Sequence, residues 1–296
     1  MTAPIDYSSL QDLADAATER GCPIWRVVLD QQTQELELPE ETVRARLRHR
    51  LDVMRASIAR GIADASPSAS GLSGGDAAMM DAAMKEGRLL GGSLQAAALR
   101  NAMAVNETNA RMGRIVAAPT AGAAGILPAL LFAVADQEGW SDERLVEGLL
   151  TASGIGLVIA KRACLSGAEG GCQAECGSAA AMAAGAVAEL AGASPEATVH
   201  AAALALKNLL GLVCDPVAGL VEVPCVKRNA MGAVHGLAAA DLALAGILSR
   251  IPPDEVVDAM MSIGRQMSPD LRETARGGLA ATPTGRAFKG KAPEIR

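Results

Sequence analysis

The sequence predicts an all-α fold, a single alanine-rich helical domain, and three observations support this. Half of the 296 residues are hydrophobic but only 2% are aromatic, so alanine and aliphatic side chains must form the core. Apolar residues recur every three or four positions, the period of a helix with one buried face. Several segments begin with the serine, proline and acidic residues that favour helix N-termini. We expect about ten helices.

The pattern divides the chain into an N-terminal segment, 1–38, and a helical domain, 39–296. Residues 1–38 show little pattern, with a short strand expected at 25–29. From Pro39, one amphipathic helix is predicted by the apolar residues Val43, Leu47, Leu51, Met54 and Ile58. Residues 67–76 predict a loop, and helical patterns follow at 77–85 and 93–105. A flexible turn at 120–125 then leads into a helix through Leu131.

Three helix starts are predicted in the second half of the chain. Ser141 is followed by two acidic residues, and Ser194 is followed by Pro195 and Glu196. The Pro252-Pro253 pair opens a helix that we expect to reach Met267. From Gly277 onward the tail is expected to be loop-like and basic.

Charge and hydropathy exclude some classes of protein. The net charge of −6 argues against nucleic-acid binding, which requires a basic face. Segments 115–135 and 230–247 are long enough to span a bilayer. However, the first contains two prolines and the second contains His235 and Asp241, so we expect buried helices and no membrane insertion. Six cysteines are too few for a disulfide framework, and no secretion signal is visible. A cytoplasmic location is expected.

Three of the cysteines lie where glycine or proline interrupts the helical pattern. They are Cys172, Cys214 and Cys225, with Cys214 expected near the end of an apolar helix. Glycine lets the backbone approach a bulky inorganic centre closely, and the spacings lack the short intervals of a zinc site. The alternative is that these cysteines are small buried hydrophobes. Cys176 could be another ligand or a packing residue.

Two polar segments could bind an anionic substrate. Ser70, Ser73, Gly74 and Gly75 lead into a predicted helix N-terminus, an arrangement that binds carboxylate or phosphate well. The segment has no lysine, so it is not a phosphate-binding P-loop. It could instead be a flexible loop with a capping serine.

The second polar segment, 106–111, lies between apolar runs and begins with Asn106. Its Asn and Arg side chains could bracket an amino-acid carboxylate, or the segment could be an exposed helix end. Thr120 adds a hydroxyl on the tight turn that follows. His200 and His235 are expected to be buried and hydrogen-bonded, and His49 solvated. No Ser/His/Asp or Cys/His set is apparent.

Together these segments resemble the alpha chain of the iron–sulfur-dependent L-serine dehydratases (L-serine ammonia-lyases). The resemblance covers nearly the whole chain, and its motifs are long. They include SGLSGGD at 70–76, AVNETNA at 104–110, APTAGAAGILP at 118–128, EGGCQAECG at 169–177, CDPVAGLVEVPC at 214–225, KRNA at 227–230 and ETARGGLAATPTG at 273–285.

The resemblance implies a [4Fe–4S] cluster bound by Cys172, Cys214 and Cys225, with one iron free of protein ligands. Such an open iron acts as a Lewis acid on the hydroxyl of L-serine while a base removes the α-proton, giving pyruvate and ammonia. Cys176 matches the motif without being a ligand. The implied substrate-binding residues are Ser70, Ser73, Gly74, Gly75, Asn106 and Thr120.

The sequence departs from the family in one respect. Family members also contain a β-part with a Ser-Ser-Ser-His-type segment that is thought to supply the catalytic histidine, and this sequence has none. We therefore expect a hetero-oligomer with a separate β chain that carries the base. The alternatives are a related lyase for threonine or cysteine, and a cluster-bearing subunit without activity. A pyridoxal phosphate enzyme is disfavoured because Lys207 and Lys227 lack a nearby phosphate-binding glycine loop.

Overall fold

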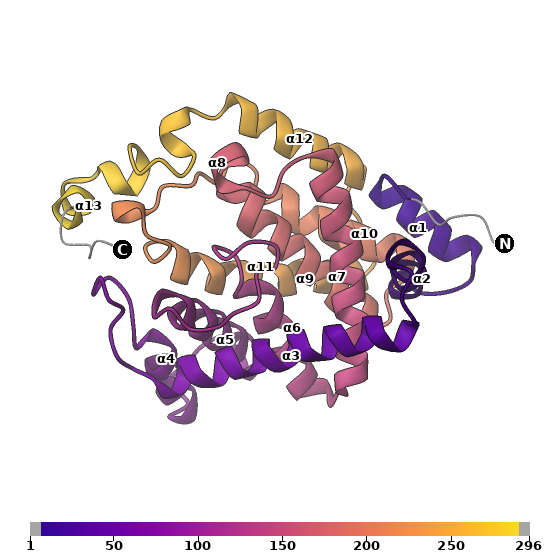
Figure 1. Cartoon of the computed structure of the whole chain (residues 1–296), viewed down its shortest axis with the longest axis horizontal. Coiled ribbons are helices and arrows are strands. Elements are labelled where there is room, and N and C mark those ends of the chain that lie inside the picture. Colours follow the sequence, from indigo (N-terminus) through magenta and orange to yellow (C-terminus); the bar gives the residue numbers. More distant parts are fainter. Residues whose placement is uncertain (1–6, 290–296) are drawn as a thin grey trace.

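A computed structural model describes residues 7–289, which form a bundle of helices (Figure 1). The described part of the chain contains thirteen α-helices. In chain order they are α1 (Leu10–Glu19), α2 (Ile24–Leu36), α3 (Glu40–Ala63), α4 (Asp76–Lys85), α5 (Gly92–Ala110), α6 (Ile126–Glu138), α7 (Asp142–Arg162), α8 (Gly167–Gly170), α9 (Ser178–Leu190), α10 (Pro195–Lys207), α11 (Cys225–Leu244), α12 (Pro253–Gln266) and α13 (Pro283–Phe288).

Shorter helical turns complete the architecture. A π-helix, η1 (Gln173–Gly177), runs directly into α9, and the 3-10 turns are η2 (Val217–Gly219), η3 (Pro269–Leu271) and η4 (Gly278–Ala281). Within residues 7–289, extended pairing is limited to one isolated parallel bridge between Cys214 and Arg272. The predicted all-α class is confirmed. No helix in this range is long and apolar enough to cross a bilayer.

Helix α9 forms the centre of the bundle, and each of its residues is buried. It contacts α6, α7, α10 and α11 (Figure 1). Its sequence is mostly alanine, so neighbouring backbones can approach it closely. A Cβ atom on Gly185 would lie 2.3 Å from Cδ1 of Ile155 on α7. This spacing explains how a chain with so few aromatic residues can fill its core.

Helix α3 follows one edge of the molecule, across the bottom of Figure 1. It buries the predicted stripe, from Val43 to Ile58, and contacts α5 and α7. A Cβ on Gly61 would lie 2.1 Å from the backbone oxygen of Ala104, so only glycine allows this approach to α5. The long helix predicted from Pro39 is confirmed.

The predicted helix starts are present. Ser141 Oγ accepts a hydrogen bond from the Arg144 amide at 3.3 Å, and Ser194 Oγ accepts one from the Ala197 amide at 3.2 Å. Pro253 occupies the first turn of α12, where its missing N–H costs no helical hydrogen bond.

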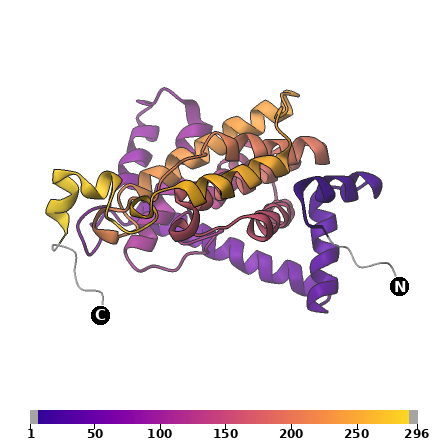
Figure 2. The same cartoon turned by 90° about the horizontal axis from the view of Figure 1, so that it is seen from above.

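The strand expected at residues 25–29 is wrong, because this segment lies within α2. Its buried residues include Ile24, Val27, Val28 and Gln31, which follow a helical period. Tertiary contacts override the β-propensity of the valines. Figures 1 and 2 show α1 and α2 at one end of the molecule and α13 at the other.

Three further placements differ from expectation. The polar segment that begins at Asn106 lies inside α5, where Asn106, Glu107 and Thr108 are fully buried. Cys214 does not end an apolar helix, since α10 stops at Lys207. The described part of the tail contains η4 and α13 and is not simply a loop. Residues 290–296 of the expected basic tail lie outside the described residues.

Candidate active site

Three cysteines from distant parts of the sequence lie around one region of the molecule. Cys172 precedes the π-helix η1, Cys214 forms the isolated bridge, and Cys225 begins α11. Their exposed fractions are only 3%, 4% and 7%, and all three are free thiols. A π-helix is uncommon and often occurs at functional sites.

A cavity of about 400 Å³ lies beside these thiols. Its lining includes Thr120, Glu175, Cys214, Cys225 and Glu273. The hydroxyl of Thr120 donates a hydrogen bond of 2.7 Å to Glu175 Oε1. Glu175 Oε2 lies 3.8 Å from the sulfur of Cys214, and burial raises the pKa of this carboxyl. The cavity is therefore bordered by two thiols and two acidic side chains.

Burial and mutual electrostatic repulsion act on the three thiols. Burial raises the pKa of Cys214, and the negative charge of Cys172 raises it further. Burial and the same neighbour raise the pKa of Cys225 to about 12. Cys214 and Cys225 therefore resist becoming thiolates unless a cation binds beside them.

Cys172 differs from the other two because it has stabilising partners. Its sulfur lies 3.3 Å from that of Cys176. A hydrogen bond from the Cys176 thiol and the positive charge of Arg228 lower the pKa of Cys172, while the pKa of Cys176 is raised. Arg228 also donates to Asp215 Oδ1 at 3.1 Å and to the Val213 oxygen at 2.8 Å.

These residues fit an iron–sulfur cluster in their chemistry. Thiolates are the usual protein ligands of such clusters, and hydrogen bonds to sulfur and partial burial set their properties. Cys172, Cys214 and Cys225 are the candidate ligands: the last two line the cavity, and Arg228 lies where it offsets negative charge at Cys172. Among residues 7–289, no three His, Cys, Asp or Glu side chains are arranged to bind a single metal ion.

The serine loop, residues 66–75, contacts the segment between Cys214 and Cys225 through one carboxylate. The hydroxyls of Ser68 and Ser73 each donate to Glu222 Oε2 at 2.5 Å, and Ser70 donates to Oε1 at 2.6 Å. Glu222 is 6% exposed. The loop therefore binds a carboxylate in this structure, and that carboxylate belongs to the chain itself.

The N-terminus of α4, at the end of the serine loop, also faces a carboxylate. Glu107 of α5 is fully buried and accepts a hydrogen bond of 2.7 Å from the Asp76 amide. Burial raises the pKa of Glu107. Gly74 and Gly75 have φ angles of 130° and 84°, so the chain turns into α4 in a conformation that favours glycine.

Beside the thiols, the turn that carries Thr120 is fixed by amide side chains. Asn229 of α11 accepts from the Gly125 amide at 3.0 Å and donates to the oxygen of Gly122 at 2.7 Å. It also donates to the oxygen of Cys225 at 2.9 Å, which joins this turn to a cavity-lining cysteine. Asn106 lies behind the turn, because a Cβ on Gly125 would be 2.3 Å from its Nδ2.

The structure thus brings most of the predicted residues into two adjoining places. Thr120, Cys214 and Cys225 line one cavity, while Ser70 and Ser73 meet Glu222 nearby. Asn106 does not line this cavity; it is buried in α5, donates to the oxygen of Ala102, and its Oδ1 has no hydrogen-bond partner.

Sequence reasoning missed several polar residues that organise the site. Glu222, Arg228 and Asn229 lie within the long motifs at 214–230, but their chemistry gave no signal by itself. Only the fold shows that Glu222 meets the serine loop and that Asn229 fixes the turn after Thr120.

The histidines lie elsewhere. His200 hydrogen-bonds to Glu196 and to the Ser249 amide, and His235 Nε2 lies 2.8 Å from the oxygen of Ala205. Both side chains are hydrogen-bonded, as predicted; His200 is buried and His235 is half-buried. His49 is exposed and contacts Arg114. None of the three lines the cavity beside the thiols.

Comparison with known proteins identifies the family of this chain. The family model described as "Serine dehydratase alpha chain" matches residues 19–280. The "Probable L-serine dehydratase, alpha chain" of Bacillus subtilis is 50% identical over 285 residues, which cover 96% of this chain and 95% of that protein. The "L-serine dehydratase, alpha chain" of Peptoniphilus asaccharolyticus is 43% identical over 282 residues, covering 95% and 97%.

A longer protein is also similar. "L-serine dehydratase 2" of Escherichia coli is 40% identical over 285 residues, covering 94% of this chain but 62% of the longer protein. On these similarities, the chain belongs to the serine dehydratase alpha-chain family and is an enzyme of the lyase class.

Proposed function

We propose that this chain is the alpha subunit of a [4Fe–4S]-dependent L-serine dehydratase, which converts L-serine to pyruvate and ammonia in the cytoplasm. The observation that carries the proposal is the convergence of three buried cysteines beside a loop that binds a carboxylate. The relatives named L-serine dehydratase support the choice of reaction.

The cluster would be bound by Cys172, Cys214 and Cys225. When bound, it would supply a Lewis acid for the departing hydroxyl group of the substrate. Around it, Arg228 offsets the negative charge at Cys172, and the Cys176 thiol donates to the same sulfur without being a ligand. Asn229 keeps the start of α11, which includes Cys225, against the turn that carries Thr120.

The serine loop is proposed to orient the substrate through its carboxylate. Ser70 and Ser73 already donate to a carboxylate, that of Glu222, and Gly74 and Gly75 shape the backbone beside them. A substrate carboxylate would compete with Glu222 for these hydroxyls. Thr120, at the edge of the thiol-lined cavity, is placed to contact the substrate, while Asn106 supports the turn from behind.

A separate β chain is proposed to complete the enzyme. The names of two close relatives specify an alpha chain, which implies a further chain. No histidine lines the cavity beside the thiols, in keeping with a base supplied by that partner. The base removes the α-proton of L-serine as hydroxide leaves. The resulting aminoacrylate tautomerises to an imine, and hydrolysis of the imine gives pyruvate and ammonia.

The first test is anaerobic reconstitution of the chain with iron and sulfide. We expect absorbance typical of thiolate-to-iron charge transfer, lost in Cys214→Ala and retained in the matched control Cys22→Ala, because Cys22 lies outside the site. A colourless wild-type chain would contradict the cluster. The absorbance should decay in air and return with iron and thiol, because an iron without a protein ligand is accessible to oxidants.

Turnover is tested next with the reconstituted α/β pair. L-Serine should give pyruvate and ammonia in equal amounts. A preference for threonine, seen as 2-oxobutyrate, or for cysteine, seen as sulfide, would change the assigned substrate. A pair that binds iron but releases no ammonia would instead be a cluster-bearing complex without this activity.

A further inference from the structure

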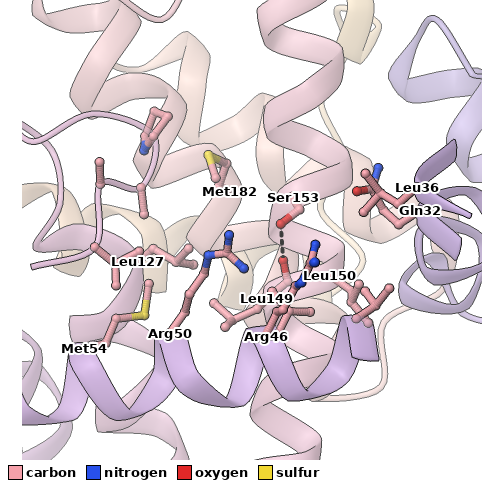
Figure 3. Close-up of a pocket in the computed structure, with 16 residues that line it drawn as sticks. Gln32, Leu36, Arg46, Arg50, Met54, Leu127, Leu149, Leu150, Ser153 and Met182 are labelled. Atoms are coloured by element: carbon pink, nitrogen blue, oxygen red, sulfur yellow. Dashed lines mark hydrogen bonds between the residues drawn. The ribbon is translucent and has the colours of Figure 1, made fainter. Parts of the chain in front are cut away.

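A second cavity, of about 320 Å³, lies between α3, α7 and residues 116–119. Figure 3 shows it with the sixteen side chains that line it. Its walls are mainly apolar, with Leu127, Leu149, Leu150 and Met182 among them. Its two charged side chains, Arg46 and Arg50, extend from α3 toward Ser153 of α7 (Figure 3).

The positive charge in this cavity has no counterpart among its walls. None of the sixteen lining residues is acidic. Within residues 7–289, neither Arg46 nor Arg50 forms an ion pair or a hydrogen bond through its side chain. Both arginines are exposed to solvent, and like charges one helical turn apart repel each other, so an anion bound between them would relieve this repulsion.

Three other arginines on the same helix are paired with carboxylates. Arg44 Nε lies 2.8 Å from Glu40 Oε1, and Arg48 Nη1 lies 2.6 Å from Glu143 Oε1. Arg55 pairs with Asp142 at 2.5 Å. Carboxylates of α3 and of the start of α7 therefore pair with these three arginines, whereas Arg46 and Arg50 have none.

The chemistry of the cavity defines its ligand. Two guanidinium groups suit a carboxylate, which accepts paired hydrogen bonds from arginine. The apolar walls suit a hydrocarbon chain, which a phosphate lacks and which in a dicarboxylate would end in a second charge without a cationic partner. A volume of 320 Å³ is at the small end of the range of about 300–1,000 Å³ for ligand sites. A long fatty acid would not fit within it.

We propose that this cavity binds a small monocarboxylate with a short apolar chain, its carboxylate between Arg46 and Arg50. The site is distinct from the thiol-lined cavity, but the two are neighbours along the chain. Residues 116–119 line the first, and Thr120, Ala121 and Gly122 line the second. The proposal does not depend on the proposed function.

The test is calorimetric titration of the full chain with pentanoate, without serine or iron. We expect saturable binding of one pentanoate per chain with Kd below about 10 mM. Arg46→Gln and Arg50→Gln should each weaken it about tenfold, the loss expected for a charged hydrogen bond. The matched control Arg48→Gln should not weaken it, since that arginine is paired with Glu41 and Glu143.

Two other ligands and one further variant distinguish specific binding in this cavity from a general attraction of anions to positive charge. Pentanamide lacks the charge and acetate lacks most of the apolar chain, so each should bind at least about tenfold more weakly than pentanoate. Ser153→Leu should abolish binding by filling the cavity while leaving both arginines in place. Thermal unfolding of each variant will show that the chain is folded.

Several results would overturn the proposal. They are the absence of saturable binding, equal affinity for acetate and pentanoate, or full binding to the doubly substituted chain. If pentanoate fails to bind but Arg46→Gln and Arg50→Gln weaken association with the β chain, the cavity receives an acidic segment of that partner. Such a result would reject the small-molecule ligand and leave the proposed dehydratase function intact.

Discussion

At the scale of single residues, the most informative contact is that of Glu222 with the serine loop. Three hydroxyls donate to one buried carboxylate, two of them to the same oxygen. Removal of an acceptor from a buried hydroxyl costs about 1–3 kcal/mol, so these contacts stabilise the loop strongly. They also show that the loop geometry suits a carboxylate. The same hydroxyls can therefore hold Glu222 and so stabilise the loop, bind the substrate carboxylate, or do each at a different stage.

Ser73→Ala distinguishes these roles. If Ser73 binds the substrate carboxylate, its loss should raise KM for serine about tenfold in the α/β enzyme and change kcat by less than about twofold. Ser68→Ala is the matched control, because Ser68 donates to the same oxygen of Glu222 but is not proposed to bind substrate. Steady-state pyruvate formation gives both constants. Equal increases in KM for the two variants would mean that the loop only positions Glu222.

The residues that could be predicted from the sequence are those whose type already suggests a role, above all the cysteines. Cysteines in glycine-broken segments indicated Cys172, Cys214 and Cys225, and two of them line the cavity that the structure reveals. Glu222 and Asn229 could not be identified in this way, because a glutamate or an asparagine has many roles. Their importance arises from partners about 150 and 105 positions away in the sequence, which only folding brings near.

At the scale of the helices, a buried carboxylate joins helices and pairs with backbone amides at a helix N-terminus that apolar packing alone would leave without hydrogen bonds. Glu189 of α9 accepts from the amides of Ile24 and Trp25, both at 3.1 Å, and from the Thr151 hydroxyl at 3.0 Å. It thus caps α2 and joins it to α7 and α9. This cap helps to explain why residues 25–29 form a helix. The sequence pattern around α2 could not reveal it.

Glu189→Gln should change how stability depends on pH. Burial raises the pKa of Glu189 above 4.5 in the folded chain. Between 4.5 and the raised pKa, the folded state binds more protons than the unfolded state, so stability falls as pH rises through this window. Urea unfolding at several pH values should therefore show the wild type losing stability relative to Glu189→Gln over that window, then a constant difference above it.

An exposed control, Glu138→Gln, accounts for the general effect of removing one carboxylate. A parallel pH profile for the wild type and Glu189→Gln would refute the prediction. Arg144 cannot be the source of the raised pKa, because its positive charge lowers the pKa of Glu189 and so opposes the effect of burial.

At the scale of the whole molecule, the C-terminal segment closes over the cysteine-bearing segment. The Cys214 amide donates to Leu271 O and the Glu273 amide donates to Cys214 O, both at 2.8 Å. Asp215 adds a second connection, because its Oδ2 accepts from the Leu279 amide at 2.8 Å while Oδ1 accepts from Arg228. Asp215 is 3% exposed. One carboxylate thus joins α11, the cysteine segment and the tail.

Asp215→Ala should therefore release the tail from the rest of the bundle. We expect trypsin to cleave after Arg276 and Arg286 about tenfold faster, which corresponds to a cost of about 1.4 kcal/mol for local opening. Limited proteolysis followed by mass spectrometry measures the cleavage sites and rates, with circular dichroism as a check on the fold. Asp258→Ala is the matched control. Asp258 lies on α12, and its carboxylate pairs with Arg162 of α7, away from the tail. If both variants are cleaved at the wild-type rate, the backbone bridge alone fixes the tail, and Asp215 serves mainly to orient Arg228 beside Cys172.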